Sequence, residues 1–136
     1  MRVLQIHCSD FEYSLRQETP VSEVPEHRGQ RLTNVLVCLI CFEKNDEGNE
    51  KSIIARFVEN LVVDKSRVGC ERILLYPYAH LSKSLGSPKL AKAFLHALKE
   101  ALKEKGLEVD KSPFGWYKAF SMKCIGHPLA EAYREF

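Results

Sequence analysis

The sequence predicts one α/β domain in which a mixed β-sheet packs against two main helices. Two stretches place apolar residues at helical spacing, residues 51–65 and the segment that begins at Ser87-Pro88, and strand-like runs lie before, between and after them. At 136 residues the chain is long enough for one compact core and too short for two ordinary domains. We therefore expect a single domain over residues 1–136.

The N-terminal part of the chain predicts three strands. Residues 2–7 and 11–16 have strand-like patterns, and the polar tripeptide Cys8-Ser9-Asp10 between them predicts a turn. We expect these two strands to pair as a hairpin. Residues 17–31 carry two prolines, a glycine and many charges, which predicts a loop, and residues 32–43 then predict a long strand.

The middle of the chain predicts a helix, a buried strand and a second helix. In residues 51–65 apolar side chains recur every three or four positions, and Gly69 follows where a helix would end. The continuous apolar run 72–76 is typical of a central strand covered on both faces. Ser87-Pro88 combines a cap residue with a proline at the first helical position, and Gly106 suits the end of that second helix.

The C-terminal part predicts short strands. Residues 107–109, 117–120 and 122–124 have strand-like patterns around the turn Pro113-Phe114-Gly115, whereas residues 130–133 favour no single assignment. Because helices alternate with strands only in the middle of the chain, a mixed sheet backed by two helices is the simplest architecture.

Composition and the cysteines indicate a protein of the reducing cytoplasm. No apolar run approaches the roughly 20 residues that a membrane helix needs, and the start lacks the apolar stretch of a signal peptide. Five cysteines are an odd number, which argues against a disulfide framework. Cys38 and Cys41 form a C-x-x-C pattern, but residues three apart on a buried strand point to opposite faces, which favours core packing over a metal or redox pair.

Charge is distributed unevenly along the chain. The formal net charge is only +2, yet nine lysines fall between Lys83 and Lys123, against four acidic residues in that segment. An edge of this kind would suit a polyanion such as RNA. Four of the lysines fall on the second predicted helix, however, and charge alone favours the simpler reading of a solvated helix face.

Polar and aromatic clusters follow two strand-like runs, at the rim where strands give way to loops. The clusters are Pro77-Tyr78-Ala79-His80-Leu81-Ser82 and Phe114-Gly115-Trp116-Tyr117-Lys118-Ala119-Phe120, and Gly126-His127-Pro128-Leu129-Ala130-Glu131 follows shortly after the second. Functional sites concentrate at such rims. We expect His80, Tyr117, Lys118 and Glu131 to converge on one pocket, with Lys118 and Tyr117 turned inward beside His80.

Each of these candidates also has a structural explanation. Alternation along a strand would send Tyr117 and Lys118 to opposite faces. A lysine among large apolar residues is more easily explained by a charged ligand than by packing, because an unpaired buried ammonium group is costly. His80 is as readily a packing residue as a functional one, and Glu131 either balances Lys118 or faces solvent.

No metal or cofactor is expected. No pair among His7, His27, His96 and His127 has metal-ligand spacing with a cysteine or a carboxylate, so these histidines are interpreted as structural. The chain has no G-x-S-x-G, no glycine-rich phosphate loop and no G-x-G-x-x-G. α/β-Hydrolase, kinase-like and dinucleotide-binding functions therefore have no support.

Four segments carry a resemblance that covers nearly the whole chain, in order and without large gaps. They are Arg2-Val3-Leu4-Gln5-Ile6-His7, Tyr76 with the first cluster, Pro113 with the second, and Gly126 to Glu131. Together they resemble the archaeal-type N-terminal editing domain of threonyl-tRNA synthetase. The resemblance implies a D-aminoacyl-tRNA deacylase-like fold, a homodimer, and hydrolysis of the ester that joins a wrong amino acid, chiefly L-serine, to the terminal adenosine of threonine tRNA.

The resemblance also implies roles for individual residues. Lys118, Tyr117, His80 and Glu131 match residues that line the family's pocket. The positions that match those holding the aminoacyl moiety are Cys41, Phe42, Pro77, Tyr78, Ala79 and Ala119, with a backbone role at Cys41-Phe42 and Tyr78-Ala79. In the family's scheme the substrate's own ribose hydroxyl activates the attacking water, so that Lys118 positions water and offsets negative charge as the ester carbonyl becomes tetrahedral.

The sequence departs from the family pattern at two places, and it leaves two alternative functions open. His7 is followed by Cys8-Ser9 where the family usually reads His-Ser-Asp, and Cys41 stands near a position where serine or alanine is common. We expect an aminoacyl-ester hydrolase domain that acts in trans or as part of a larger synthetase. The alternatives are a tRNA-binding appendage without catalysis and a general D-aminoacyl-tRNA deacylase.

Overall fold

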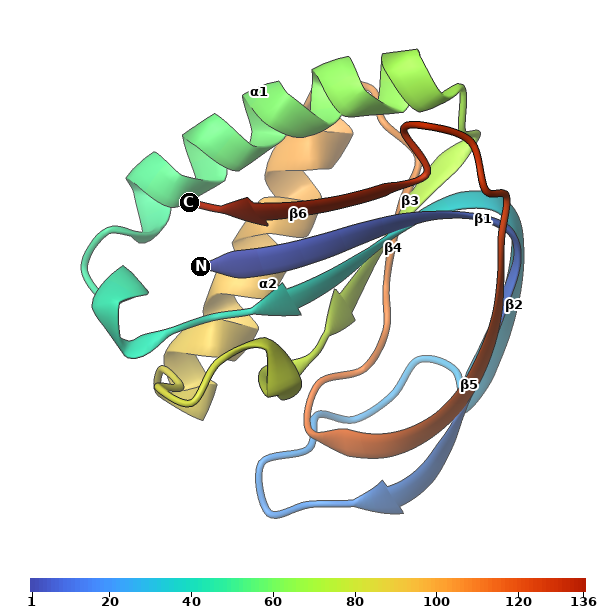
Figure 1. The fold of residues 1–136 in the computed structure, drawn as a ribbon. Helices are drawn as coiled ribbons and strands as arrows, with labels where there is room; N and C mark the ends of the chain where they lie inside the picture. Colours follow the sequence, from blue (N-terminus) through green and yellow to red (C-terminus); the bar gives the residue numbers. More distant parts are fainter.

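A six-stranded sheet forms one layer of the molecule, and two helices cover one of its faces (Figure 1). The computed structural model describes all 136 residues. The strands are β1 (Arg2–Glu18), β2 (Gly29–Cys41), β3 (Arg72–Pro77), β4 (Val109–Lys111), β5 (Trp116–Cys124) and β6 (Glu131–Glu135). The helices are α1 (Glu50–Val68) and α2 (Pro88–Glu104), with single 3₁₀ turns η1 (Lys44–Asp46) and η2 (Ala79–Leu81). The expected fold class, a mixed sheet with two main helices, is confirmed.

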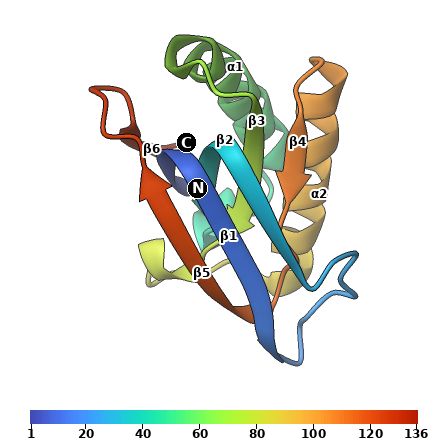
Figure 2. The ribbon, with the colours of Figure 1, turned by 90° about the vertical axis from the view of Figure 1, so that its right-hand side faces the viewer.

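The strand order is β4-β3-β2-β1-β5, and β6 pairs with the first part of β1. The pairs β2/β3 and β3/β4 are parallel because a helix connects each of them, whereas β1 is antiparallel to β2, β5 and β6. β5 and β6 therefore share one edge of the sheet, β5 along residues 8–18 of β1 and β6 along residues 2–6 (Figure 2). Neither helix is long and apolar enough to cross a lipid bilayer.

Two apolar clusters lie on opposite faces of the sheet. On β2, Leu36, Cys38 and Ile40 pack in the cluster beneath the helices, while Val37 and Leu39 belong to the cluster on the other face. Both faces of β3 and of residues 35–41 of β2 are buried, which is why these stretches are continuous apolar runs rather than alternating ones.

The sheet curls strongly around the face that the helices leave open. β3 and β5 are three strand spacings apart, which would separate them by roughly 14 Å in a flat sheet. The ring of Phe120 on β5 nevertheless lies 5.8 Å from the ring of Tyr76 on β3. Figure 1 shows the bend of β1, β2 and β5 that produces this approach. We call this second face, built around Phe11, Tyr13 and Tyr76, the concave face.

The predicted N-terminal hairpin is wrong, because residues 2–18 form one continuous strand. Ser9 is not a turn residue but part of an irregularity in which it lies opposite Asn34, whose φ is +45°. The alternation shifts by one residue there, so that Cys8 and Phe11 both face the concave side. Pairing with β2 and β5 on either side keeps the polar tripeptide extended.

Several other strands are longer than the sequence predicted. The loop expected over 17–31 is shortened by pairing at both ends, and the two strands expected at 117–120 and 122–124 are a single strand, β5. The unassigned segment 130–133 begins β6. The predicted end of the first helix and start of the second are confirmed. Gly69 adopts a left-handed φ of +71° after α1, and Pro88 begins α2.

Candidate functional site

Lys118 on β5 points onto the concave face. Its Nζ lies 4.8 Å from the centre of the Tyr76 ring, an arrangement in which the negative face of the ring attracts the ammonium group. Burial, aided by the nearby charge of Lys111 and opposed by Glu23, lowers the pKa of Lys118 to about 8. No carboxylate forms an ion pair with Lys118, so its charge is available to a ligand.

A loop docks beside the start of β5 and fixes the approach to Lys118. Glu23 pairs with the ammonium of Lys111, and its Oε1 accepts the backbone N–H of Phe114 at 2.7 Å. A Cβ on Gly115, whose φ is +75°, would lie 2.7–2.8 Å from backbone atoms of residues 21 and 22. Glycine is required there because the loop packs directly against the turn.

The first polar cluster lies at the end of β3, on the same side as Tyr76. The rings of Tyr78 and His80 pack edge to face at 5.2 Å, and Tyr78 also contacts the concave-face cluster. The backbone N–H of Tyr78 donates to the carbonyl of Ile40 at 2.8 Å, which continues the pairing of β2 and β3 past Pro77. The structure thus brings Lys118, Tyr76 and Tyr78 to one face, with His80 exposed at its rim.

Cys41 and Phe42 lie beside this segment and are both buried. The Cys41 thiol donates to the carbonyl of Ala79 at 3.6 Å, which ties the end of β2 to the turn that carries His80. The Phe42 ring packs against Phe94 of α2 at 5.0 Å, on the helix side of the sheet. Only the backbone of Phe42 can therefore serve a ligand near His80. Cys38 and Cys41 are both free thiols, and both are buried in the interior as predicted.

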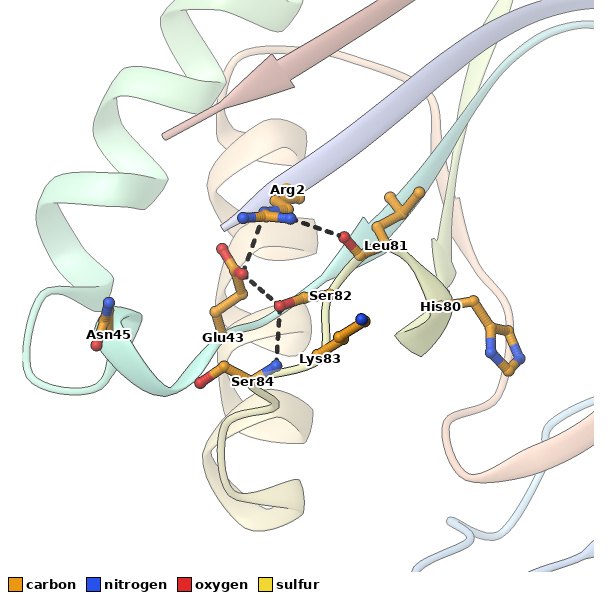
Figure 3. A pocket seen from close by; sticks show the side chains of 8 residues that line it. All are labelled: Arg2, Glu43, Asn45, His80, Leu81, Ser82, Lys83 and Ser84. Carbon is orange, nitrogen blue, oxygen red and sulfur yellow. Dashed lines mark hydrogen bonds and ion pairs between the residues drawn. The ribbon is translucent and has the colours of Figure 1, made fainter.

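A polar cavity of about 520 Å³ opens next to His80 (Figure 3). Its floor is a network in which Arg2 pairs with Glu43 at 3.1 Å and the Ser82 hydroxyl donates to Glu43 at 2.5 Å. Arg2 also donates to the carbonyl of Leu81 at 3.1 Å. In Figure 3 the His80 ring lies at the far end, apart from this network. The cavity is lined by Arg2, Glu43, Asn45, His80, Leu81, Ser82, Lys83 and Ser84.

The expectation that Tyr117 turns inward with Lys118 is wrong. Tyr117 is 64% exposed and lies on the opposite face of β5, and Ala119 follows it on that face. Strand alternation decides the matter, since only one of two neighbouring side chains reaches the concave face. The aromatic neighbour of the ammonium is Tyr76 instead.

The expectation that Glu131 balances Lys118 is also wrong within one chain. Glu131 is exposed and pairs with Ile6 on β1, whereas Lys118 pairs with Leu15, nine residues further along that strand. Nine residues correspond to roughly 30 Å of extended strand. The contact that Glu131 does make is with the thiol of Cys124, which donates to its Oε1 at 3.8 Å.

A chain of hydrogen bonds holds the loop before Glu131. The backbone N–H of Leu129 donates to Nδ1 of His127, so Nε2 of His127 donates to Nδ1 of His7 at 2.8 Å, and Nε2 of His7 donates to Asn34 at 2.9 Å. These roles follow because each neutral ring has one donor and one acceptor nitrogen. His7 and His127 thus tie this loop to β1 and β2, which agrees with the structural interpretation.

The lysine-rich segment divides between the two layers. The lysines of α2 lie in the helix layer, across the sheet from the Lys118 ammonium. Lys83 is exposed and lines the cavity beside His80. A polyanion that reached both Lys118 and α2 would have to pass around an edge or an end of the sheet.

Sequence reasoning missed Tyr76, Glu23 and Lys111. A signal existed for Tyr76, the last residue of a central strand and one position before the first polar cluster. No local signal marks Glu23, because its contacts with Lys111 and Phe114 join segments about ninety residues apart.

Comparison with known proteins gives a consistent result at the level of the family. A family model described as the archaea-specific editing domain of threonyl-tRNA synthetase matches residues 1–136. Threonine–tRNA ligases from Methanobrevibacter smithii and Pyrococcus horikoshii are 43% and 42% identical to the chain over 98% of its length. The alignment covers 22% of each ligase, so the chain spans about a fifth of the length of these curated relatives.

A solved structure shares the fold. The c-Myc DNA unwinding element binding protein superposes with a TM-score of 0.72 over 100% of this chain and 99% of its own, at 12% sequence identity. That likeness supports the predicted D-aminoacyl-tRNA deacylase-like fold, and the family match extends over every element described above. The chain therefore belongs to the family of archaea-specific editing domains of threonyl-tRNA synthetase.

Proposed function

We propose that this domain hydrolyses the aminoacyl ester of threonine tRNA mischarged with L-serine. The observation that carries the proposal is the Lys118 ammonium, held on the concave face against Tyr76 without a carboxylate partner. A cation kept in a partly dry site has to be explained, because burial alone would favour an apolar side chain there.

In the proposed reaction, Lys118 orients water and stabilises negative charge. Attack on the ester carbonyl produces a tetrahedral oxyanion, and a preorganised ammonium group stabilises that charge more in a site with little water than in bulk solvent. The ribose hydroxyl of the substrate takes the proton of the attacking water, so that no side chain of the domain needs to be a strong base. His80 and Tyr78 would contact the substrate at the rim, and the backbone near Cys41 and Ala79 would hold the seryl group.

The size difference between serine and threonine explains the need for such a site. Serine lacks one methyl group, and a binding pocket can use a missing methylene for about 1–3 kcal/mol, roughly a 10–200-fold preference. Protein synthesis requires a larger ratio. A second site that hydrolyses the smaller product supplies the rest, and the remainder of a synthetase several times longer than this domain would supply the first site.

We also propose that the domain pairs with a second copy of itself. Exposed apolar side chains gather on β5, on β6 and on the loop between them, namely Tyr117, Phe120, Ile125, Leu129 and Tyr133. Exposed apolar side chains along an open sheet edge favour association with another chain. In this proposal Tyr117 and Glu131, which do not reach the Lys118 pocket of their own chain, act on the pocket of the second copy.

A deacylation assay separates catalysis from binding. The domain is mixed with threonine tRNA that carries radiolabelled serine, and release of serine is followed over time. The expected result is catalysis, in which a small amount of domain hydrolyses a molar excess of seryl-tRNA. A tRNA-binding appendage, favoured by the outward orientation of Tyr117, would protect the ester and slow its spontaneous loss. Parallel reactions with D-aminoacyl esters on several tRNAs test the broader deacylase, which predicts release from all of them.

A further inference from the structure

Cys8 and Cys124 lie directly opposite each other on neighbouring antiparallel strands. The register pairs their Cα atoms across β1 and β5, just before the irregularity at Ser9. The N–H of Ile125 donates to the carbonyl of His7 at 3.0 Å, so the hydrogen bond flanks the cysteine pair instead of joining it. In such a non-hydrogen-bonded pair the Cα atoms are about 4.5 Å apart, within the range of about 4.4–6.8 Å that disulfides span.

The two thiols share the concave face and differ in access. Cys8 is fully buried in the apolar cluster, and Cys124 packs against the same cluster while staying partly exposed. Neither thiol is firmly held: Cys8 donates to the carbonyl of Ile6 at 3.7 Å, and Cys124 donates to Glu131 at 3.8 Å. Rotation about each Cα–Cβ bond would break these weak contacts, and the paired Cα positions would let the two sulfur atoms meet.

We propose that Cys8 and Cys124 form a peroxide-sensitive dithiol site that closes to a cross-strand disulfide. The Cys124 thiolate attacks a peroxide oxygen, the O–O bond breaks, and sulfenic acid forms at Cys124 with loss of water. The Cys8 sulfur then attacks the Cys124 sulfur, the S–O bond breaks, and a second water leaves with the Cys8 proton. Two thiols are oxidised by two electrons and one hydroperoxide is reduced.

The order of the two steps follows from the environments of the thiols. Cys124 reacts first because it is the one that an oxidant can reach. Burial raises the pKa of Cys8 to about 11, so Cys8 stays protonated at neutral pH and its attack is slow for a free thiol. Its fixed position opposite Cys124 compensates, since neighbouring groups react at a high effective concentration.

Oxidation would reach the editing site of a second copy through Glu131, and this consequence rests on the proposed function and the proposed pairing of two copies. The disulfide removes the only donor that the structure shows on the Glu131 carboxylate. Glu131 begins β6, and its preceding residue is fixed by the N–H of His7 donating to the carbonyl of Ala130 at 2.7 Å. The strand therefore stays paired while the side chain of Glu131 loses its contact.

Peptide mapping of the full chain tests the dithiol site without reference to activity. The protein is treated with hydrogen peroxide, its free thiols are alkylated during unfolding, and trypsin is added without reductant. The expected product is a peptide of residues 3–16 joined to residues 124–134, two hydrogens lighter than the sum, which disappears with dithiothreitol. Cys38, Cys41 and Cys70 should remain alkylated.

Matched variants sharpen the test. Cys70→Ser, which removes a buried cysteine outside the pair, should leave the linked peptide unchanged, whereas Cys8→Ser should leave Cys124 as sulfenic or sulfinic acid. Wild-type protein that accumulates sulfinic acid at Cys124, stays fully reduced, or links other cysteines overturns the proposal. A linked peptide without a change in deacylation rate would contradict only the coupling to Glu131.

Discussion

Lys118 shows how one side chain can oppose folding and still be retained. Its burial lowers the pKa from the ordinary value of 10.5 to about 8, which means that the folded state disfavours the charged form. The cation–π contact with Tyr76 recovers part of that cost. A residue of this kind indicates function, because an apolar side chain would serve the fold better at the same position.

Lys118→Met should therefore stabilise the domain. Removing the burial cost outweighs losing the cation–π contact, and we expect the free energy of unfolding to rise by about 1–2 kcal/mol at pH 7. Urea denaturation followed by fluorescence measures the change. Lys123→Met, on the same strand and exposed, is the matched control and should shift the free energy by less than about 0.5 kcal/mol. A less stable Lys118→Met protein would contradict this reasoning.

The charge of Lys118 also predicts two opposite pH dependences. Between about pH 8 and 10.5 the unfolded chain retains a proton that the folded chain has released, so the contribution of Lys118 to the free energy of unfolding rises with pH. The rate of the catalysed reaction should decrease as the pH rises above about 8, because the Lys118 ammonium then becomes neutral. The measurement is serine release from pH 6 to 9.5, after subtraction of the uncatalysed ester hydrolysis at each pH. A catalysed rate that stays constant from pH 7 to 9.5 would exclude a role for the charge.

At the scale of the elements, the ends of the helices were predictable from the sequence, whereas the pairing of distant strands was not. Gly69 and Ser87-Pro88 marked helix limits correctly because a left-handed cap and a first-turn proline act on their own residues. Ser9 was misread because the same polar sequence suits a turn and a bulge, and only pairing with β2 and β5 decides between them. Tyr117 was misplaced because the sequence did not show which face of β5 is concave.

Docking of the loop against the turn before β5 gives an element-scale prediction. Gly115→Ala should destabilise the fold by about 2–4 kcal/mol, because it adds both a left-handed alanine and a clash with backbone at residues 21 and 22. Gly126→Ala is the matched control, with a similar φ of +78° and nothing within 4 Å of the added Cβ, and it should cost about 1–2 kcal/mol. Urea midpoints of the two variants measure the difference. Equal losses would mean that the loop does not press on Gly115.

At the scale of the whole molecule, the pocket of a single chain lacks two of the four side chains that the sequence assigned to it. Lys118 faces the concave side and His80 lies at its rim, while Tyr117 and Glu131 are exposed on the β5 and β6 edge. Fold and family were predictable because motifs in order along the chain identify them. The positions of Tyr117 and Glu131 were not, because they depend on which face of β5 is concave and on where β6 pairs along β1.

Self-association through the β5 and β6 edge should be visible in solution. Sedimentation is expected to give twice the 15.6 kDa mass of one chain. Leu129→Asp, which places a charge on the exposed apolar edge, should shift the protein to monomer and slow deacylation. Val24→Asp is the control, since Val24 is 94% exposed on the loop between β1 and β2 and is not one of the apolar side chains named for that edge. A monomeric wild-type domain with full activity would refute the proposed pairing.

The most direct test of the account is the single-turnover rate of serine release from seryl-tRNA(Thr) by the wild-type, Lys118→Met and Lys123→Met domains. If the inward ammonium stabilises the oxyanion, Lys118→Met should lose roughly 100-fold or more in rate, as removal of one such donor does in other acyl-transfer sites, while remaining folded. Lys123→Met should match the wild type. A Lys118→Met domain that releases serine within twofold of the wild-type rate would contradict the account.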